Sequence, residues 1–128
     1  MRERKRVSSG GRWEPLVGYS RAVRVGDTAY VSGCTAAGPD GRVQAPGDVY
    51  GQTMAAIHTM ERALRELGLG LEHVVKTGVY LADMDQWEGV ARAHRELFGA
   101  VLPACTWVEV GRMIHPEMLV EIDAVAVE

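Results

Sequence analysis

Chemically useful side chains gather on two alternating runs near the carboxyl end of the sequence. Alternate residues of a β-strand point to opposite faces. On that basis each of two runs has a continuous apolar face and a mixed face: CTWVEVGR (residues 105–112) and MLVEIDAVAV (118–127). The mixed faces carry a thiol, an indole and three carboxylates: Cys105, Trp107, Glu109, Glu121 and Asp123. A thiol can act as a nucleophile and a carboxylate as a base. Because such a face is an odd one to turn toward water, we expect a pocket wall or a subunit interface.

The two runs are predicted to pair with each other as a hairpin. Five residues that include His115 and Pro116 join them, which suits a short connection between antiparallel strands. In a symmetric hairpin, odd-numbered residues pair with odd. The even-numbered residues are then expected to pack under helices: Thr106, Val108, Val110, Val120, Ile122, Ala124 and Ala126.

Earlier strands are predicted from alternation and from turn residues. Residues 1–20 hold a possible short strand followed by the Gly- and Pro-marked loop GGRWEPLVGYS. The runs AVRV and TAYVSG flank Gly26-Asp27, which indicates a tight hairpin. Residues 34–47 are rich in Gly, Pro and Asp and are expected to form a surface loop.

Two helices are predicted with a strand between them. Apolar residues recur at steps of three and four from Val49 to Leu67, after Asp48 as a candidate cap and before Gly68. A strand is expected over residues 74–81. A second stripe runs from Trp87 to Phe98, with Asp83 or Asp85 as its cap. The predicted order is therefore β-β-β-α-β-α-β-β.

The bulk properties limit the class of protein. A length of 128 residues predicts one domain, 1–128. No apolar run reaches the ~20 residues of a membrane helix, and no apolar stretch follows the charged MRERKR, so a cytoplasmic protein is expected. The net charge is −3, and because the first six residues carry four basic groups and one acidic group, the rest is more acidic still. That balance disfavours a nucleic-acid surface.

Several kinds of site lack support in the sequence. The four His and two Cys show no metal-ligand spacing, and there is no phosphate-binding Gly-rich motif or Ser-centred nucleophile elbow. His94 lies on an apolar helical stripe and is expected to be a core or interface histidine, with a functional role left open. Cys105 is interpreted as a small apolar filler rather than a nucleophile, because no His is near it in sequence.

Two helices can cover only one side of a sheet of this size. The other side must be solvated or covered by a second subunit. Because the sequence pattern places Trp107 and Leu119 on that side, we expect an oligomer.

The segments GYSRAVRVGDTAYVSG, HRELFG, LPACTWVEVGRM and VEIDAVAV together resemble the RidA family (reactive intermediate deaminases, also called YjgF or L-PSP proteins). The similarity spans nearly the whole chain, in order. It implies a chorismate-mutase-like α+β fold, with two helices on one face of a mostly antiparallel sheet. It also implies a homotrimer with clefts between subunits. The family's best-known activity is hydrolysis of 2-imino and enamine acids to 2-keto acids and ammonia, with no metal and no organic cofactor.

The resemblance also implies site residues. Tyr19 matches the family's pocket tyrosine, and Glu121 matches the glutamate that positions the attacking water. The segment Ser32, Gly33 and Cys34 matches the backbone that lines the cleft. The family's carboxylate-gripping arginine follows Pro-Ala, but here the segment reads Pro103-Ala104-Cys105-Thr106, so Cys105 replaces it. Cys105, Thr106 and Trp107 are therefore expected to line the ligand site without that cation.

Three functions follow as hypotheses. The first is a hydrolase of an imine, enamine or related C=N compound whose substrate lacks the usual carboxylate. The second is a trimer that binds a small ligand without turnover. The third, RNA cleavage or translation inhibition, is disfavoured by the acidic body of the chain.

Overall fold

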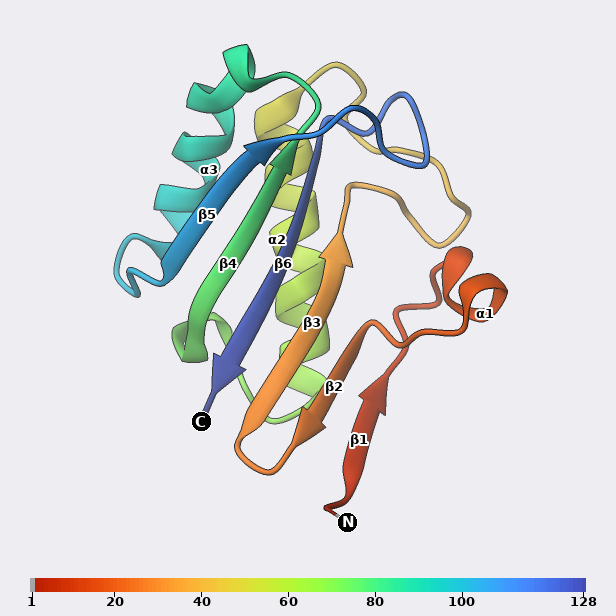
Figure 1. Ribbon diagram of the computed structural model, residues 1–128, viewed down its shortest axis with the longest axis vertical. Helices are drawn as coiled ribbons and strands as arrows, with labels where there is room; N and C mark the ends of the chain where they lie inside the picture. Colours follow the sequence, from red (N-terminus) through yellow and green to blue (C-terminus); the bar gives the residue numbers. More distant parts are fainter. Residues whose placement is uncertain (1) are drawn as a thin grey trace.

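A computed structural model describes residues 2–128, which form a six-stranded sheet backed by two long helices (Figure 1). In chain order the elements are β1 (Arg4–Val7), α1 (Trp13–Val17), β2 (Ala22–Val25), β3 (Thr28–Cys34), α2 (Val49–Glu66), η1 (Leu71–His73), β4 (Val74–Leu81), η2 (Met84–Gln86), α3 (Trp87–Phe98), β5 (Ala104–Glu109) and β6 (Val120–Val127). This order confirms the predicted succession of strands and long helices. Across residues 2–128, no helix has both the length and the apolar character that a membrane crossing requires.

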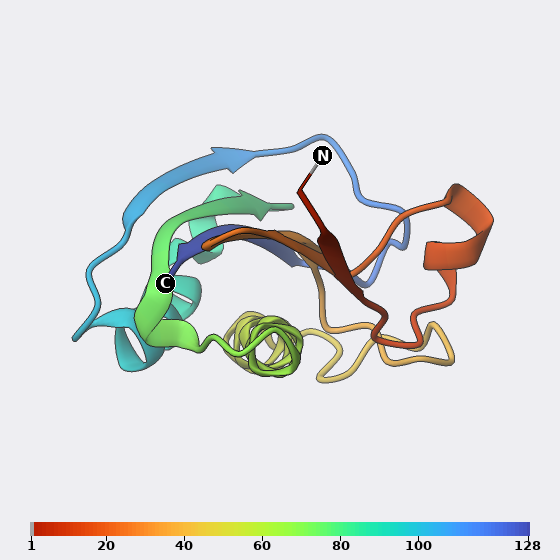
Figure 2. The ribbon, with the colours of Figure 1, turned by 90° about the horizontal axis from the view of Figure 1, so that it is seen from below.

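The sheet has the spatial order β1-β2-β3-β6-β4-β5 and is antiparallel except where β4 pairs with β5. Helices α2 and α3 lie on one side of it (Figure 2). The expected α+β architecture, with two helices on one face of a mostly antiparallel sheet, is therefore confirmed. The opposite face is left without a covering element among the described residues.

The core lies between the sheet and the two long helices. Even-numbered residues of β6, from Val120 to Ala126, are buried, while the odd-numbered ones are half-buried, as the alternation predicts. Helix α2 begins where Asp48 accepts a hydrogen bond from the Gly51 backbone N–H at 3.0 Å. The β2–β3 hairpin turns at Gly26 and Asp27, and Gly26 has a φ of 61°, which favours glycine.

The predicted hairpin between the last two strands is wrong. Strand β4 lies between β5 and β6 and pairs with both, so the segment from Val110 to Leu119 is a crossover rather than a turn. The fully buried Gln52 of α2 holds this crossover: its amide nitrogen donates to the Glu117 carbonyl at 2.9 Å, and its amide oxygen accepts from the Leu119 N–H at 2.9 Å. A partner so distant in sequence leaves no local signal.

The predicted orientation of β5 is also wrong. The parallel register sets Cys105 beside Thr77 and Trp107 beside Val79, and both of those β4 residues are buried under the helices. The odd-numbered side chains of β5 therefore face the helices, whereas Thr106 and Val108 face away. The predicted hairpin with β6 had placed the even-numbered residues of β5 under the helices. Pairing with β4 in the observed register places the odd-numbered residues there instead.

Two local features also differ from expectation. Residues 13–17 form the short helix α1 within the predicted loop, and it ends at Gly18, which has a φ of 90°. Asp83 caps η2, accepting from the Asp85 N–H at 3.0 Å, and neither aspartate caps α3 directly. The loop predicted over residues 34–47 begins one residue later, because Cys34 still belongs to β3, and it contains one isolated bridge between Ala37 and Val43.

Candidate functional site

A cavity of about 350 Å³ is lined by residues of α1, β3, α2 and the segments that lead into β2 and β6. Its polar lining includes Tyr19, Arg21, Ser32, Gly33, Cys34 and Glu121. Its apolar lining includes Trp13, Val17, Ile114 and Met118. Five residues that the sequence singled out, Tyr19, Ser32, Gly33, Cys34 and Glu121, therefore surround one cavity, although they come from three separate segments.

Glu121 is the carboxylate of this cavity. It stands on the half-buried face of β6, and its side chain lies directly over Gly33, so close that a Cβ at that position would collide with the carboxylate. Burial raises the pKa of Glu121, the charge of Asp123 raises it further, and the charge of Arg21 opposes both. A carboxylate in this condition accepts a proton more readily than one in water.

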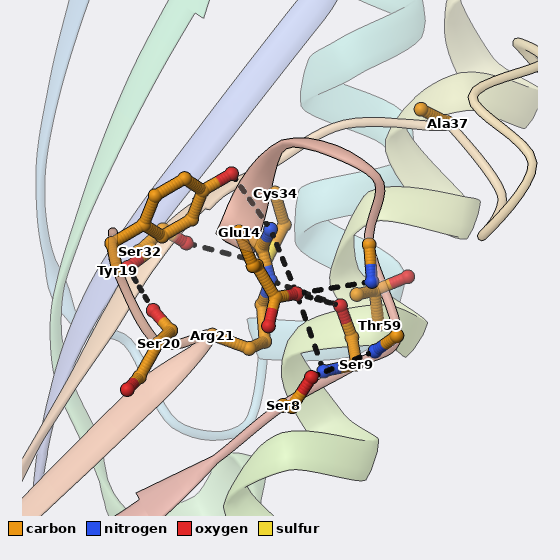
Figure 3. A network of polar contacts seen from close by, with 12 residues as sticks. Ser8, Ser9, Glu14, Tyr19, Ser20, Arg21, Ser32, Cys34, Ala37 and Thr59 are labelled. Atoms are coloured by element: carbon orange, nitrogen blue, oxygen red, sulfur yellow. Dashed lines mark hydrogen bonds and ion pairs between the residues drawn. The ribbon is translucent and has the colours of Figure 1, made fainter. Parts of the chain in front are cut away.

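Arg21 is a buried cation whose donors are all directed at protein atoms (Figure 3). Its Nε donates to Ser9 Oγ at 3.3 Å, and its Nη1 donates to the Gly33 carbonyl at 2.6 Å and faces Cys34 Sγ at 3.7 Å. Its Nη2 donates to Tyr19 Oη at 3.4 Å and lies 3.6 Å from Glu14 Oε2. Each of the three guanidinium nitrogens therefore has a protein partner, and Arg21 serves to hold the cavity wall.

Glu14 neutralises Arg21 from behind the cavity wall. Its Oε2 accepts hydrogen bonds from Ser9 Oγ at 2.5 Å and from the Gly11 N–H at 3.3 Å (Figure 3). Burial raises the pKa of Glu14, but the hydrogen bonds from Ser9 and the charge of Arg21 outweigh it and hold the pKa below its usual value. Among residues 2–128, its other oxygen, Oε1, is buried without a hydrogen-bond partner.

Cys34 and Ser32 shape the wall but offer little reactivity. Cys34 is 1% exposed, and burial raises the pKa of its thiol to about 11, so it stays protonated near neutrality. The Ser32 hydroxyl donates to the Ser20 carbonyl at 2.7 Å. The Tyr19 hydroxyl accepts from Arg21 and so keeps its own proton for another partner.

Cys105, Thr106 and Trp107 do not line this cavity within one protomer. The sheet separates Glu121 from Cys105, since Glu121 faces away from the helices and Cys105 faces toward them. Trp107 packs against the hydrophobic core, and Thr106 accepts a hydrogen bond from Lys76 Nζ at 3.3 Å on the opposite face. An intersubunit cleft that joins these residues to Glu121 stays a prediction.

Sequence reasoning missed the contact between Cys105 and His94. Sγ of Cys105 lies 3.9 Å from Nε2 of His94, although eleven positions separate them in sequence. Their meeting depends on the β4–β5 register, which a single sequence does not reveal. His94 is half-buried and within hydrogen-bonding distance of Thr77 Oγ1, at 3.0 Å.

Other cavity residues carried no functional signal either. From the sequence alone, Glu14 would be interpreted as a solvated acid in a Gly- and Pro-rich loop. The five-residue helix α1 that buries it is too short to show an apolar periodicity. Arg62 of α2 lines the cavity with an exposed guanidinium whose Nη2 donates to Thr59 Oγ1 at 3.2 Å. Arg24 is engaged elsewhere, 2.7 Å from Glu128 Oε1, and does not line the cavity.

Comparison of the sequence with those of known proteins shows which family the chain belongs to. Residues 10–128 match the family described as "Endoribonuclease L-PSP". The chain belongs to the RidA (YjgF, L-PSP) family. An uncharacterised protein of Streptomyces coelicolor is 41% identical over 122 residues, which cover 95% of this chain and 90% of the relative. The mouse protein named 2-iminobutanoate/2-iminopropanoate deaminase is 34% identical over 110 residues, covering 86% of this chain and 81% of the relative.

Solved structures of RidA-family proteins have the same fold. A crystal structure of a family member from Mycobacterium tuberculosis has 40% sequence identity and a TM-score of 0.89, with 98% of this chain and all of that chain covered. The YjgF protein of E. coli has 26% identity and a TM-score of 0.84, with 97% and 98% covered. The RidA fold expected from the sequence is thus confirmed over nearly the whole chain.

Proposed function

We propose that the protein hydrolyses a small imine, enamine or related C=N compound in the cavity around Glu121. The observation that carries this proposal is the Glu121 carboxylate, which is half-buried, has a raised pKa and is held over Gly33. The name of the mouse relative, a 2-iminobutanoate/2-iminopropanoate deaminase, supports the reaction class.

Hydrolysis by this site needs one base and one water molecule. The carboxylate of Glu121 accepts a proton from water while the water oxygen bonds to the imine carbon, and it then passes that proton to the nitrogen, which gives the carbinolamine. Glu121 next accepts the carbinolamine hydroxyl proton and passes it to the nitrogen as the C–N bond breaks, so that ammonia leaves, a carbonyl group remains and the Glu121 carboxylate is regenerated. The hydroxyl of Tyr19, positioned by Arg21, donates to the polar end of the substrate.

The substrate of this cavity lacks the carboxylate of a 2-imino acid. Arg21, the buried guanidinium beside Glu121, already directs all its donors at protein atoms. Cys105 stands where the resemblance places the carboxylate-binding arginine, and a thiol cannot form the bidentate pair. The apolar lining from Trp13, Val17 and Ile114 instead suits a substrate with an apolar group.

The complete site is proposed to lie between subunits of a homotrimer. Within one protomer the cavity has no contribution from β5, and the resemblance implies that Cys105, Thr106 and Trp107 of a neighbouring protomer complete it. The side of the sheet away from the helices exposes apolar residues that an interface would cover, including Tyr30 and Val108.

The experiment is a turnover assay on freshly generated imines. An amino-acid oxidase supplies 2-iminopropanoate, and an amine oxidase supplies an imine without a carboxylate. Released ammonia is measured by a coupled enzyme, with the spontaneous rate subtracted. We expect catalysed release from the second imine at a higher kcat/KM than from the first. Saturable binding of either imine's stable amine analogue without catalysed release would favour the alternative, a trimer that binds a small ligand without turnover.

A further inference from the structure

Two carboxylates stand on the same face of β6, each over a glycine of a neighbouring strand. Glu121 lies over Gly33 of β3. Asp123, two positions further along β6, pairs with Gly78 of β4, and a Cβ at Gly78 would collide with the Asp123 carboxylate. Because residues two apart on a strand point the same way, the Cα atoms of Glu121 and Asp123 are about 7 Å apart. Glu121 lines the cavity, whereas Asp123 lines the groove on the open face of the sheet.

Tyr80 holds the Asp123 carboxylate in this place. Tyr80 pairs with Glu121 in the β4–β6 register, and its side chain reaches diagonally across the sheet, so that its hydroxyl donates to Asp123 Oδ2 at 2.9 Å. The missing side chain at Gly78 provides room for this contact, because an added Cβ would also lie 3.2 Å from Tyr80 Oη. The hydrogen bond to Asp123 raises the pKa of Tyr80, so the proton stays on the tyrosine and Asp123 is the acceptor.

Three other ionisable groups lie around Glu121 on the β2 and β3 side of the sheet. The Arg21 guanidinium opposes protonation of Glu121, but it is itself compensated by Glu14, whose Oε2 lies 3.6 Å from Nη2. The Cys34 thiol, whose pKa burial raises to about 11, carries no charge at pH 7. The negative charge of Asp123 therefore acts on Glu121 in the same direction as burial, which is the larger cause of its raised pKa.

The groups that face Asp123 from β4 and β5 leave its charge in place. The Tyr80 hydroxyl is uncharged at pH 7. Lys76 lines the same groove, but its Nζ donates to Thr106 Oγ1 at 3.3 Å. Two like charges about 7 Å apart at a partly solvated site repel each other enough to move a titration midpoint by about 0.5 to 1.5 pH units.

We propose that Tyr80 and Asp123 are positioning residues for Glu121: Tyr80 fixes the Asp123 carboxylate, and the negative charge of Asp123 makes Glu121 a stronger proton acceptor. This inference rests on the proposed function, because it concerns the base of that reaction. Tyr80 and Asp123 line the groove rather than the cavity, so they act through Glu121 and not on the substrate. Their effect belongs in the titration of Glu121 and in the pH dependence of kcat/KM.

NMR of the side-chain carboxyl carbon, in protein made with isotope-labelled glutamate, measures the titration of Glu121 directly. The Glu121 signal is identified by its loss in Glu121→Gln. Asp123→Asn removes the charge but keeps the shape, and Tyr80→Phe removes only the hydroxyl. The matched control is Asp27→Asn, which removes the same charge at the β2–β3 turn, about 20 Å along the sheet from Glu121. Each variant is checked for native thermal unfolding.

We expect the Glu121 midpoint to fall by about 0.5 to 1.5 pH units in Asp123→Asn. It should fall by less in Tyr80→Phe, where the carboxylate is no longer held, and stay unchanged in Asp27→Asn. The pH profile of kcat/KM for imine hydrolysis should move with the midpoint. An Asp123→Asn midpoint equal to that of Asp27→Asn would overturn the proposal, and a wild-type midpoint in Tyr80→Phe would overturn the role of Tyr80. Shifted midpoints without catalysed hydrolysis in any protein would instead refute the proposed function alone.

Discussion

The engagement of Arg21, the buried cation of the cavity, is the residue-scale feature that bears on substrate choice. Arg21 lines the cavity, yet Glu14, Ser9, Tyr19 and the Gly33 carbonyl occupy its donors. A guanidinium whose nitrogens all contact protein atoms must give up one of these contacts to bind a carboxylate in full, which offsets the gain. Our proposal of a substrate without a carboxylate rests on this engagement of Arg21 and on Cys105 together.

Cys105→Arg should raise activity on 2-iminopropanoate. A charge-assisted hydrogen bond contributes roughly 1.5–3 kcal/mol, so a restored pair corresponds to an increase of about 10- to 100-fold in kcat/KM. Ammonia release from wild type and variant is compared under identical oxidase supply. Arg62→Gln is the control, since Arg62 is the exposed guanidinium of the cavity. High wild-type activity that disappears in Arg62→Gln would identify Arg62 as the substitute cation and refute our substrate assignment.

Glu121→Gln should stabilise the protein at pH 7. Because the folded pKa of Glu121 is raised, folding disfavours its charged form. Stability from this group is therefore present below the unfolded pKa of about 4.3 and is lost as pH rises through the raised folded value. The amide avoids that loss, so we expect a rise in Tm of about 2 °C or more at pH 7 and no difference near pH 4. An unchanged or lower Tm at pH 7 would contradict the raised pKa.

At the scale of elements, local patterns predicted the long helices and the strands, but not which strands are neighbours. The apolar repeat from Val49 to Leu67 and the alternation in β6 each depend on residues only a few positions apart, so both can be recognised in the sequence. The position of β5 in the sheet depends on β4 and on Gln52, which are far from it in sequence. Because a hairpin with β6 was assumed instead, Cys105 was predicted on the side of the sheet away from the helices, whereas it faces them. The polar cavity was predicted through resemblance, whereas the Arg21 network needs three-dimensional contacts.

An irregularity in the β3 strand positions Glu121, the proposed base. Its pairing with β6 shifts register between Val31 and Cys34, which places Ser32 and Gly33 against Glu121. Such bulges commonly re-aim backbone beside functional sites. The missing side chain at Gly33 provides the space into which the carboxylate fits.

Gly33→Ala should therefore reduce kcat/KM by about 10-fold or more while leaving the fold intact. The added methyl collides with the mobile end of Glu121 rather than with backbone, so the carboxylate must move. Gly38→Ala is the matched control in the same cavity, because its Cβ meets the nearest atom at an ordinary 3.4 Å. Imine hydrolysis and thermal unfolding are measured for both variants. Full activity in Gly33→Ala would show that the position of Glu121 over Gly33 is not required.

At the scale of the whole molecule, no element of residues 2–128 covers the face of the sheet opposite α2 and α3 (Figure 2). Tyr30 is 56% exposed and Val108 is 42% exposed on this face, and a shallow groove of about 430 Å³ runs between them. Packing against further copies would bury these side chains. The closed trimer that we propose would cover the same face on every protomer and would bring β5 of one chain toward the cavity of another.

We predict a particle of about 42 kDa, three times the 13.9 kDa chain, by sedimentation equilibrium at micromolar concentration. Val108→Glu should shift the mass toward that of the single chain, because a charge in an apolar interface is costly. Trp87→Glu, a substitution of a 50% exposed side chain at the start of α3, should not change the mass. A wild-type mass of 13.9 kDa would remove the intersubunit cleft.

Ammonia release by Glu121→Gln and wild type, on an imine without a carboxylate, tests the central claim most directly. The amide retains the shape of Glu121 but accepts no proton from water, so we expect kcat/KM to fall by about 100-fold or more. The wild-type rate should rise with pH as Glu121 ionises, with a midpoint above the usual carboxyl range of about 4.3. A Glu121→Gln enzyme with the wild-type rate and the same pH profile would contradict the assignment of Glu121 as the base.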